Sequence, residues 1–252
     1  MIEATVVVPC FNEASRLDRA RFLELARDPS VRLLFVDDGS RDDTRGMLAE
    51  MKAAGGGRVD FLGFDANRGK AEAVRQGLLA GVTRGAKVVG FLDGDLATPP
   101  SEMLRLVREL DERGAQVVLG ARVGLAGTNI DRKMARHYLG RLFATAASVI
   151  LRERFYDTQC GAKLFRVTDG LREALARPFV SRWAFDVELI GRLLVGTASA
   201  PGLRPTDFVE VPLHEWTDVP GSKLRPTAFV RVAADLVRIE GELAAARSRR
   251  GG

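Results

Sequence analysis

The sequence predicts an α/β protein in which helices cover both faces of a mostly parallel, Rossmann-like β-sheet. Short apolar runs rich in β-branched residues alternate along the chain with segments whose apolar residues recur at helical spacing. This alternation is typical of parallel strands joined by helical crossovers. Acidic residues also follow several of the apolar runs, and the carboxyl ends of parallel strands are where open α/β sheets bind ligands.

Strands and helices are expected to alternate in the first half of the chain. Thr5–Val8 is a β-branched run closed by Pro9, which is typical of a buried parallel strand. The segments between such runs carry apolar residues three and four positions apart, as helices do. The expected strands are 5–8, 33–36, 59–62, 88–92 and 116–119, and the expected helices are 17–26, one carrying Met47 to Met51, 70–82, and one from Pro100 to Gly114.

Three helices and one strand are expected in the second half. A helix over 132–151 begins with basic residues and becomes apolar from Leu142 onwards. This pattern suits contact with an anionic, hydrophobic substrate or with a membrane interface. It equally suits a buried packing helix whose first half is solvated. A helix led by Trp183 and a strand over 208–211 follow, and residues 247–252 are expected to form a frayed basic tail. The last helix has one apolar face, formed by Val232, Leu236, Ile239 and Leu243.

Composition indicates a globular chain with a full core. Of its 252 residues, 46% are hydrophobic and 28% are charged, so one large domain is expected. The 38 basic and 33 acidic side chains are spread along the chain and give a net charge of +5, which is a weak indication of anionic partners. The sequence contains no RNP motif, zinc-ligand pattern or recognition-helix signature, so nucleic acid is not an expected partner.

Several features bear on the compartment. Cys10 and Cys160 lack metal-ligand spacing, and so few cysteines suit a reducing environment. The first residues lack the basic segment and cleavage site of a signal peptide. The longest apolar run, Leu142 to Leu151, is too short to span a bilayer. We therefore expect a cytoplasmic protein, either free in solution or in peripheral contact with a membrane.

The run Val88–Leu92 ends in Asp93-Gly94-Asp95. On an extended chain, alternate residues share a face about 6–7 Å apart, so the two carboxylates can bracket one divalent cation. The cations that carry phosphates, Mg²⁺ and Mn²⁺, prefer such oxygen ligands, and Gly94 lets a ligand approach the backbone. Taken alone, the same residues also suit a turn with two solvated acids.

Neighbouring motifs favour the binding site. Asp37 and Asp38 follow the strand 33–36, where they can accept hydrogen bonds from ribose hydroxyls or a base N–H. Asn67-Arg68-Gly69-Lys70 opens a helix, and Lys70 together with the first free N–H groups forms a corner suited to phosphate. A solvated lysine at a helix start is the alternative for Lys70.

Together, these segments resemble the family 2 glycosyltransferases with the GT-A fold, over nearly the whole chain. The matching segments are Pro9-Cys10-Phe11-Asn12-Glu13, Val36-Asp37-Asp38-Gly39-Ser40, Asn67-Arg68-Gly69-Lys70 and Asp93-Gly94-Asp95. Within the family, the chain looks most like the polyprenyl-phosphate (dolichyl-phosphate) glucosyl- and mannosyltransferases. This closer resemblance lies in Asp93 to Pro100, Asp157-Thr158-Gln159-Cys160-Gly161-Ala162-Lys163, Trp183 to Glu188, and Gly221-Ser222-Lys223.

The resemblance implies a role for each motif. The residues implied for the nucleotide are Pro9, Glu13 and Asp37 or Asp38; those for the metal and diphosphate are Asp93 and Asp95; and those facing donor or acceptor phosphates are Arg122, Arg132 and Lys223, with Arg136 and Ser222 as further substrate-binding candidates. It also implies one GT-A domain over 1–246, with a nucleotide-sugar-binding half (1–122) and an acceptor-binding half (123–246). Two departures stand out: Ala97 replaces a glutamine of some relatives, so water would fill one metal-ligand position, and the transmembrane helices common among these relatives are absent.

We expect an inverting displacement at the anomeric carbon of a UDP- or GDP-hexose, assisted by Mg²⁺ or Mn²⁺ on Asp93 and Asp95. A polyprenyl phosphate acceptor is already ionised near neutral pH. A hydroxyl acceptor needs a base, for which Asp157, Asp186 and Glu188 are the candidates. The alternatives are the same chemistry on a soluble small-molecule acceptor and, from another class, a non-catalytic nucleotide-sugar-binding protein.

Overall fold

The computed structural model describes residues 2–131, 134–218 and 226–251. Its strands are β1 (Ala4–Cys10), β2 (Val31–Asp37), β3 (Val59–Gly63), β4 (Val88–Leu92), β5 (Val117–Ala121), β6 (Asn129–Asp131), β7 (Ala162–Arg166), β8 (Phe208–Pro212) and β9 (Glu215–Thr217). Its helices are α1 (Arg19–Leu25), α2 (Thr44–Ala54), α3 (Lys70–Thr83), α4 (Pro100–Glu112), α5 (Met134–Leu151), α6 (Asp169–Ala176), α7 (Phe185–Val195) and α8 (Pro226–Gly251), with a 3₁₀ turn η1 (Pro205–Asp207).

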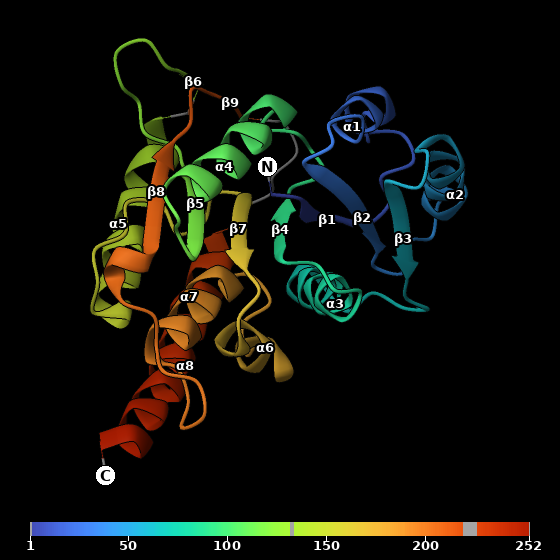
Figure 1. Cartoon of the computed structure of the whole chain (residues 1–252). Helices are drawn as coiled ribbons and strands as arrows, with labels where there is room; N and C mark the ends of the chain where they lie inside the picture. Colours follow the sequence, from blue (N-terminus) through green and yellow to red (C-terminus); the bar gives the residue numbers. More distant parts are fainter. Residues whose placement is uncertain (1, 132–133, 219–225, 252) are drawn as a thin grey trace.

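Within the described residues, one seven-stranded sheet forms the centre of the molecule, in the order β3-β2-β1-β4-β7-β5-β8 (Figure 1). All neighbouring pairs are parallel except those that β7 makes with β4 and β5. The small strands β6 and β9 pair separately. The predicted α/β fold with a mostly parallel sheet is therefore confirmed.

Alternation along the strands divides the core into two layers. In β1, Val6 and Val8 pack on one face of the sheet and Val7 on the other. The first face is covered by α1, α2 and α4, and the second by α3, α5, α6, α7 and α8 (Figure 1). Burying each large apolar side chain in these layers contributes about 1.5–3 kcal/mol, and Phe22 of α1 adds an edge-to-face contact on Phe35 of β2, with ring centroids 5.3 Å apart.

The antiparallel strand β7 is the main element that the sequence did not predict. Polar residues precede it and Lys163 interrupts its apolar pattern, so it lacks the continuous apolar run of a central strand. Its register pairs Lys163 with Phe91 of β4 and Leu119 of β5. This insertion brings the loop that precedes β7 beside the end of β4.

The end of the chain also differs from the expectation. Residues 247–252 were expected to fray, but α8 continues to Gly251. Arg247 donates from Nη2 to the Ile150 carbonyl at 2.7 Å, and Arg250 donates to the Val195 carbonyl. These carbonyls lie in the last turns of α5 and α7, where unpaired C=O groups attract cations, and this explains why the basic residues are held in place. Among the described helices, none combines the length and apolar character needed to cross a bilayer.

Candidate active site

A cleft of about 380 Å³ opens at the carboxyl ends of β1, β2 and β4, within the usual size range of ligand pockets, roughly 300–1,000 Å³. Parallel strands place their carboxyl ends on one edge of the sheet, which brings together motifs that are far apart in the sequence. Six of the residues proposed from the sequence line the cleft: Pro9, Glu13, Asp38, Lys70, Asp93 and Asp95.

Asp93 lies at the floor of this cleft between a cation and a glycine. Lys70 Nζ is 2.7 Å from Asp93 Oδ1. On the other side, a Cβ at position 161 would overlap the Asp93 carboxylate, so only glycine fits there. The Asp93 N–H also donates to the Gly161 carbonyl at 2.9 Å. The loop before β7 thus sets the position of Asp93.

Asp95 follows in a strained turn. Leu96 has a φ of 52°, a left-handed conformation that costs a leucine about 1–3 kcal/mol. The turn lets Asp95 Oδ1 accept the Ala97 N–H at 3.0 Å. Burial raises the pKa of Asp95, and the charge of Asp93 raises it further. Backbone strain at Leu96 and charge repulsion between Asp93 and Asp95 occur within four residues, and such a combination is typical of a binding site.

Asp93 and Asp95 fit a divalent cation that shares its coordination with substrate. Among the described residues, no group of three or more His, Cys, Asp or Glu side chains could hold a metal. Mg²⁺ is commonly bound by one or two carboxylates together with substrate phosphates, and a cation here would relieve the repulsion that raises the pKa of Asp95. The methyl group of Ala97 supplies no ligand.

The two acids at the carboxyl end of β2, Asp37 and Asp38, already have partners within the chain. Asp37 is buried and accepts the Ser40 N–H at 3.0 Å and Arg45 Nε at 3.2 Å. Asp38 accepts Asn67 Nδ2, the Arg68 N–H and the Gly69 N–H at 2.9, 2.7 and 2.8 Å. Asp38 therefore fixes the segment that leads into α3, and with it the position of Lys70.

Glu13 lies at the opposite wall. Its carboxylate pairs with Arg16 at 2.5 Å, and both residues line the cleft. The Glu13 N–H donates to Thr44 Oγ1 at 2.8 Å, which ties the loop after β1 to the start of α2. Arg16 adds a positive charge to the lining of the cleft, and this charge acts to lower the pKa of Asp95.

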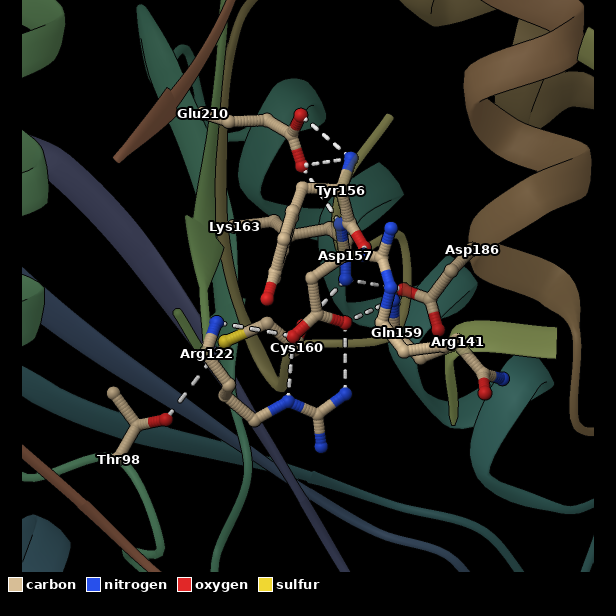
Figure 2. A network of polar contacts seen from close by, with 10 residues as sticks. All are labelled: Thr98, Arg122, Arg141, Tyr156, Asp157, Gln159, Cys160, Lys163, Asp186 and Glu210. Carbon is tan, nitrogen blue, oxygen red and sulfur yellow. Dashed lines mark hydrogen bonds and ion pairs between the residues drawn. The ribbon is translucent and has the colours of Figure 1, made fainter. Parts of the chain in front are cut away.

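A second, smaller cavity of about 30 Å³ lies beside Arg122 and Asp157. Arg122 forms a two-point ion pair with Asp157, from Nε at 2.6 Å and Nη2 at 2.8 Å, and its N–H adds a third bond at 3.1 Å (Figure 2). Burial alone would raise the pKa of Asp157, but the Arg122 charge outweighs it and lowers the pKa. Glu210 of β8 accepts the N–H groups of Tyr156 and Asp157, each at 2.8 Å, and so holds this segment against the sheet.

Asp186 lies in the first turn of α7 and does not border either cavity. It is buried and pairs with Lys163, whose Nζ lies 2.8 Å from Oδ1 (Figure 2). Burial raises the pKa of Asp186, and Lys163 opposes that rise. Glu188, two residues further along α7, accepts the N–H groups of Val180 and Ser181 and pairs with Arg192 at 2.5 Å.

Comparison with known proteins identifies the family. The model of glycosyl transferase family 2 matches residues 5–169. This chain belongs to glycosyltransferase family 2. The matched range includes the residues that line the cleft and the loop before β7. The family match and the site geometry therefore involve the same residues.

The relatives of this glycosyltransferase extend the match to nearly the whole chain. It is 31% identical over 262 residues to the dolichyl-phosphate beta-glucosyltransferase of Homo sapiens, covering 94% of this chain and 74% of the relative. It is 27% identical over 229 residues to the polyprenol monophosphomannose synthase of Mycolicibacterium smegmatis, covering 89% and 83%. Glucosyl-3-phosphoglycerate synthase of Mycobacterium tuberculosis, solved with Mg²⁺ and uridine diphosphate, superposes with a TM-score of 0.64 at 20% identity, over 95% of this chain and 80% of that one. This last likeness confirms the GT-A fold.

Four proposed substrate-binding residues of the glycosyltransferase are not placed. Arg132, Ser222 and Lys223 lie outside the described residues, and Arg136 lies in α5 with its side chain outside them. Their proposed roles stay predictions.

Sequence reasoning gave no individual role to several residues of the glycosyltransferase site. Arg16 was not named, and Asn67 and Lys163 were named only as members of motifs. Arg16 and Asn67 line the cleft, and Lys163 and Glu210 hold its supporting loop. The signal available for Lys163 was a lone cation among Ala162, Leu164 and Phe165, a placement that is rare unless the charge is paired.

Proposed function

We propose that this glycosyltransferase moves a hexose from a UDP- or GDP-sugar to a polyprenyl phosphate, with inversion at the anomeric carbon. The acceptor phosphate oxygen forms a bond to that carbon while the bond to the nucleoside diphosphate breaks, and the electron pair leaves on the diphosphate oxygen. The names of the human and mycobacterial relatives, which specify dolichyl phosphate and polyprenol, support this acceptor class.

One observation carries the choice of a phosphate acceptor: each candidate base is already committed within the chain. Asp157 accepts three bonds from Arg122, Asp186 is buried against Lys163, and Glu188 is held by Arg192. A hydroxyl acceptor needs a base within hydrogen-bond reach. A phosphate monoester is largely ionised near pH 7, because its second pKa is about 6, and needs none.

Each of the two cavities is proposed to bind one substrate, the first the nucleotide sugar and the second the acceptor phosphate. When bound, Mg²⁺ or Mn²⁺ on Asp93 and Asp95 supplies charge stabilisation for the leaving diphosphate. Lys70 and the N-terminus of α3 face the same diphosphate, while Pro9, Glu13 and Asp38 border the nucleotide. Arg122, oriented by Asp157, faces the acceptor phosphate, because an arginine held on one edge keeps its other N–H groups free for an anion.

A soluble phosphorylated acceptor is the second candidate. The structural neighbour from Mycobacterium tuberculosis is named for 3-phosphoglycerate, and the site chemistry that suits a lipid phosphate also suits a free one. The two sources share the phosphate and differ in the lipid tail.

The test measures nucleoside diphosphate release with Mg²⁺ or Mn²⁺, UDP-glucose or GDP-mannose, and either polyprenyl phosphate, 3-phosphoglycerate or no acceptor. Release that depends on metal and on polyprenyl phosphate is expected. Asp95→Asn is expected to lower turnover about 100-fold or more, because it removes a charged ligand of the cation that would stabilise the leaving diphosphate, whereas Asp111→Asn, at an exposed position of α4, keeps full activity. Release with 3-phosphoglycerate alone would select the soluble acceptor, and full activity of Asp95→Asn would exclude the metal assignment.

A further inference from the structure

Lys163 is a buried cation to which the proposed reaction assigns no part. Its side chain is fully buried in the middle of the sheet, on β7. Its ammonium lies 2.8 Å from Asp186 Oδ1 and donates to the Cys160 carbonyl (Figure 2). It also lies 5.1 Å from the centroid of the Phe91 ring. Two of these neighbours are close in sequence to Asp93 and to the glycine packed against it: Phe91 is two positions before Asp93, and Cys160 precedes Gly161.

Fold stability alone does not account for this ion pair. Removing two charges from water costs more than their attraction returns in many buried pairs, and an apolar pair of the same volume is often as stable or more so. Strands β4 and β5 on either side of Lys163 are apolar where they face it, with Phe91 and Leu119 in register. A cation retained at such a position points to a role beside the cleft.

The first consequence of the Lys163 contacts reaches Asp93 through the backbone. Lys163 holds the Cys160 carbonyl, and the next residue, Gly161, accepts the Asp93 N–H and abuts the Asp93 carboxylate. The turn from Cys160 to Lys163 is thus closed by the lysine's own side chain. If that closure is lost, Gly161 is free to move, and Asp93 moves with it.

The second consequence concerns Asp186. Lys163 is the ion-pair partner of this buried carboxylate, with Nζ 2.8 Å from Oδ1. Without Lys163, burial would favour the neutral form of Asp186. The charges of Lys70 and Asp93 also act on Asp186, so the charge state of Asp186 is coupled to that of the cleft.

We propose that Lys163 is a positioning residue of the transferase site, which fixes Gly161 against Asp93 and holds the Asp186 carboxylate in an ion pair beside the same turn. The inference rests on the proposed function, because it concerns the same diphosphate-binding residues. Lys163 touches no substrate in this arrangement. It acts through Asp186 on one side and through the Cys160–Gly161 turn on the other.

Lys163→Met tests the proposal, since methionine keeps the length of the side chain and removes the charge. At a temperature where the variant is folded, kcat is expected to fall about ten-fold or more, as for other small displacements of reacting groups, with donor KM changed less than about three-fold. The acidic limb of the kcat profile is expected to move to higher pH, because Asp186 loses the cation that opposes its protonation. The charged groups that face Asp186 are Lys163 of β7, Lys70 of α3 and Asp93 after β4, and Lys163 is the one removed.

Arg192→Met is the matched control. It removes the cation of another buried pair, with Glu188 on the same helix as Asp186, and neither residue lines the cleft. This variant is expected to lose stability while keeping the wild-type kcat and pH profile. A Lys163→Met enzyme with the same behaviour would overturn the proposal, because Lys163 would then serve the fold alone.

Two further measurements keep the test decisive. If Lys163→Met does not fold, the double variant Lys163→Met/Asp186→Asn removes both charges; it is expected to fold with turnover at least about ten-fold below wild type, and wild-type turnover would overturn the proposal. Carboxyl ¹³C NMR titration of Asp186 needs no acceptor: a higher pKa in Lys163→Met is expected, and an unchanged pKa would overturn the proposal. Absence of transfer to polyprenyl phosphate by wild-type enzyme, by contrast, would count only against the proposed acceptor.

Discussion

The carboxylate of Asp93 occupies a space bounded on both sides. Lys70 Nζ approaches Oδ1 at 2.7 Å, and the Cα of Gly161 leaves no room for a side chain on the other side. Neither neighbour is close to Asp93 in sequence. The position of this acid is therefore determined by α3 and by the loop before β7 together. A change in either element is expected to alter how the site binds the diphosphate.

Gly161→Ala is expected to displace the Asp93 carboxylate, because the new methyl group would overlap it. A shift of about 1 Å in a reacting group can cost about 100-fold in rate, so turnover is expected to fall about 10- to 100-fold. Steady-state kinetics would measure this. Gly170→Ala, in α6, is the control, since its Cβ would meet its nearest atom at an ordinary 3.7 Å. Equal activity of the two variants would show that Asp93 tolerates displacement.

At this scale, sequence reasoning identified acids but not their partners. Asp38, Asp93 and Asp95 were predicted because acids at strand ends are recognisable from a strand pattern. That Asp38 is occupied by the Arg68 and Gly69 N–H groups depends on how the loop after β3 folds back. No local sequence pattern specifies how that loop folds. The hydrogen-bond partners of each carboxylate could therefore be identified only from the structure.

Strand β7 is the element that connects the two halves of the site. It lies between β4 and β5 and runs antiparallel to both. Asp93 directly follows β4, and Arg122 directly follows β5. Its apolar pattern is broken by Lys163, so strand periodicity alone could not reveal it. Parallel strands such as β1 and β4 were predictable because they contain long apolar runs; β7 owes its place to tertiary pairing.

Glu210 of β8 anchors the loop that leads into β7, and its titration can be followed through stability. Burial raises the pKa of Glu210, and the charge of Asp157 adds to this, while the N–H groups of Tyr156 and Asp157 oppose it. The folded protein then holds this proton at a pH where the unfolded chain has lost it. The contribution of Glu210 to stability is therefore fully present below the ordinary glutamate pKa and declines as pH rises through the raised value.

Glu210→Gln removes that titration. The stability of wild type minus that of Glu210→Gln is expected to decrease as pH rises above about 4.3, the ordinary value for glutamate, and urea midpoints measured between pH 4 and 7 would record it. Glu215→Gln, at an exposed position of β9, controls for the loss of one negative charge. A difference between wild type and Glu210→Gln that stays constant with pH would contradict the raised pKa.

Within the part of the chain that the structure describes, helix α5 exposes two large apolar side chains. On α5, Leu142 and Val149 are 70% and 74% exposed, and residues seven positions apart lie on the same side of a helix, two turns apart. The net charge of the chain is +5. Exposed apolar residues on a helix of a basic protein suit the surface of an anionic membrane, which is where a polyprenyl phosphate would be found.

We therefore predict that the protein sediments with vesicles containing phosphatidylglycerol, more strongly at low salt, because screening weakens attraction to an anionic surface. Leu142→Asp/Val149→Asp is expected to weaken this binding about ten-fold or more, since each side chain would lose its apolar contact and add a negative charge. Val237→Asp, at a 73% exposed position of α8, is the matched control and should bind nearly as wild type. Equal sedimentation of all three proteins would place the contact elsewhere, and no sedimentation of wild type at low salt would leave the soluble phosphorylated acceptor as the better candidate for this transferase.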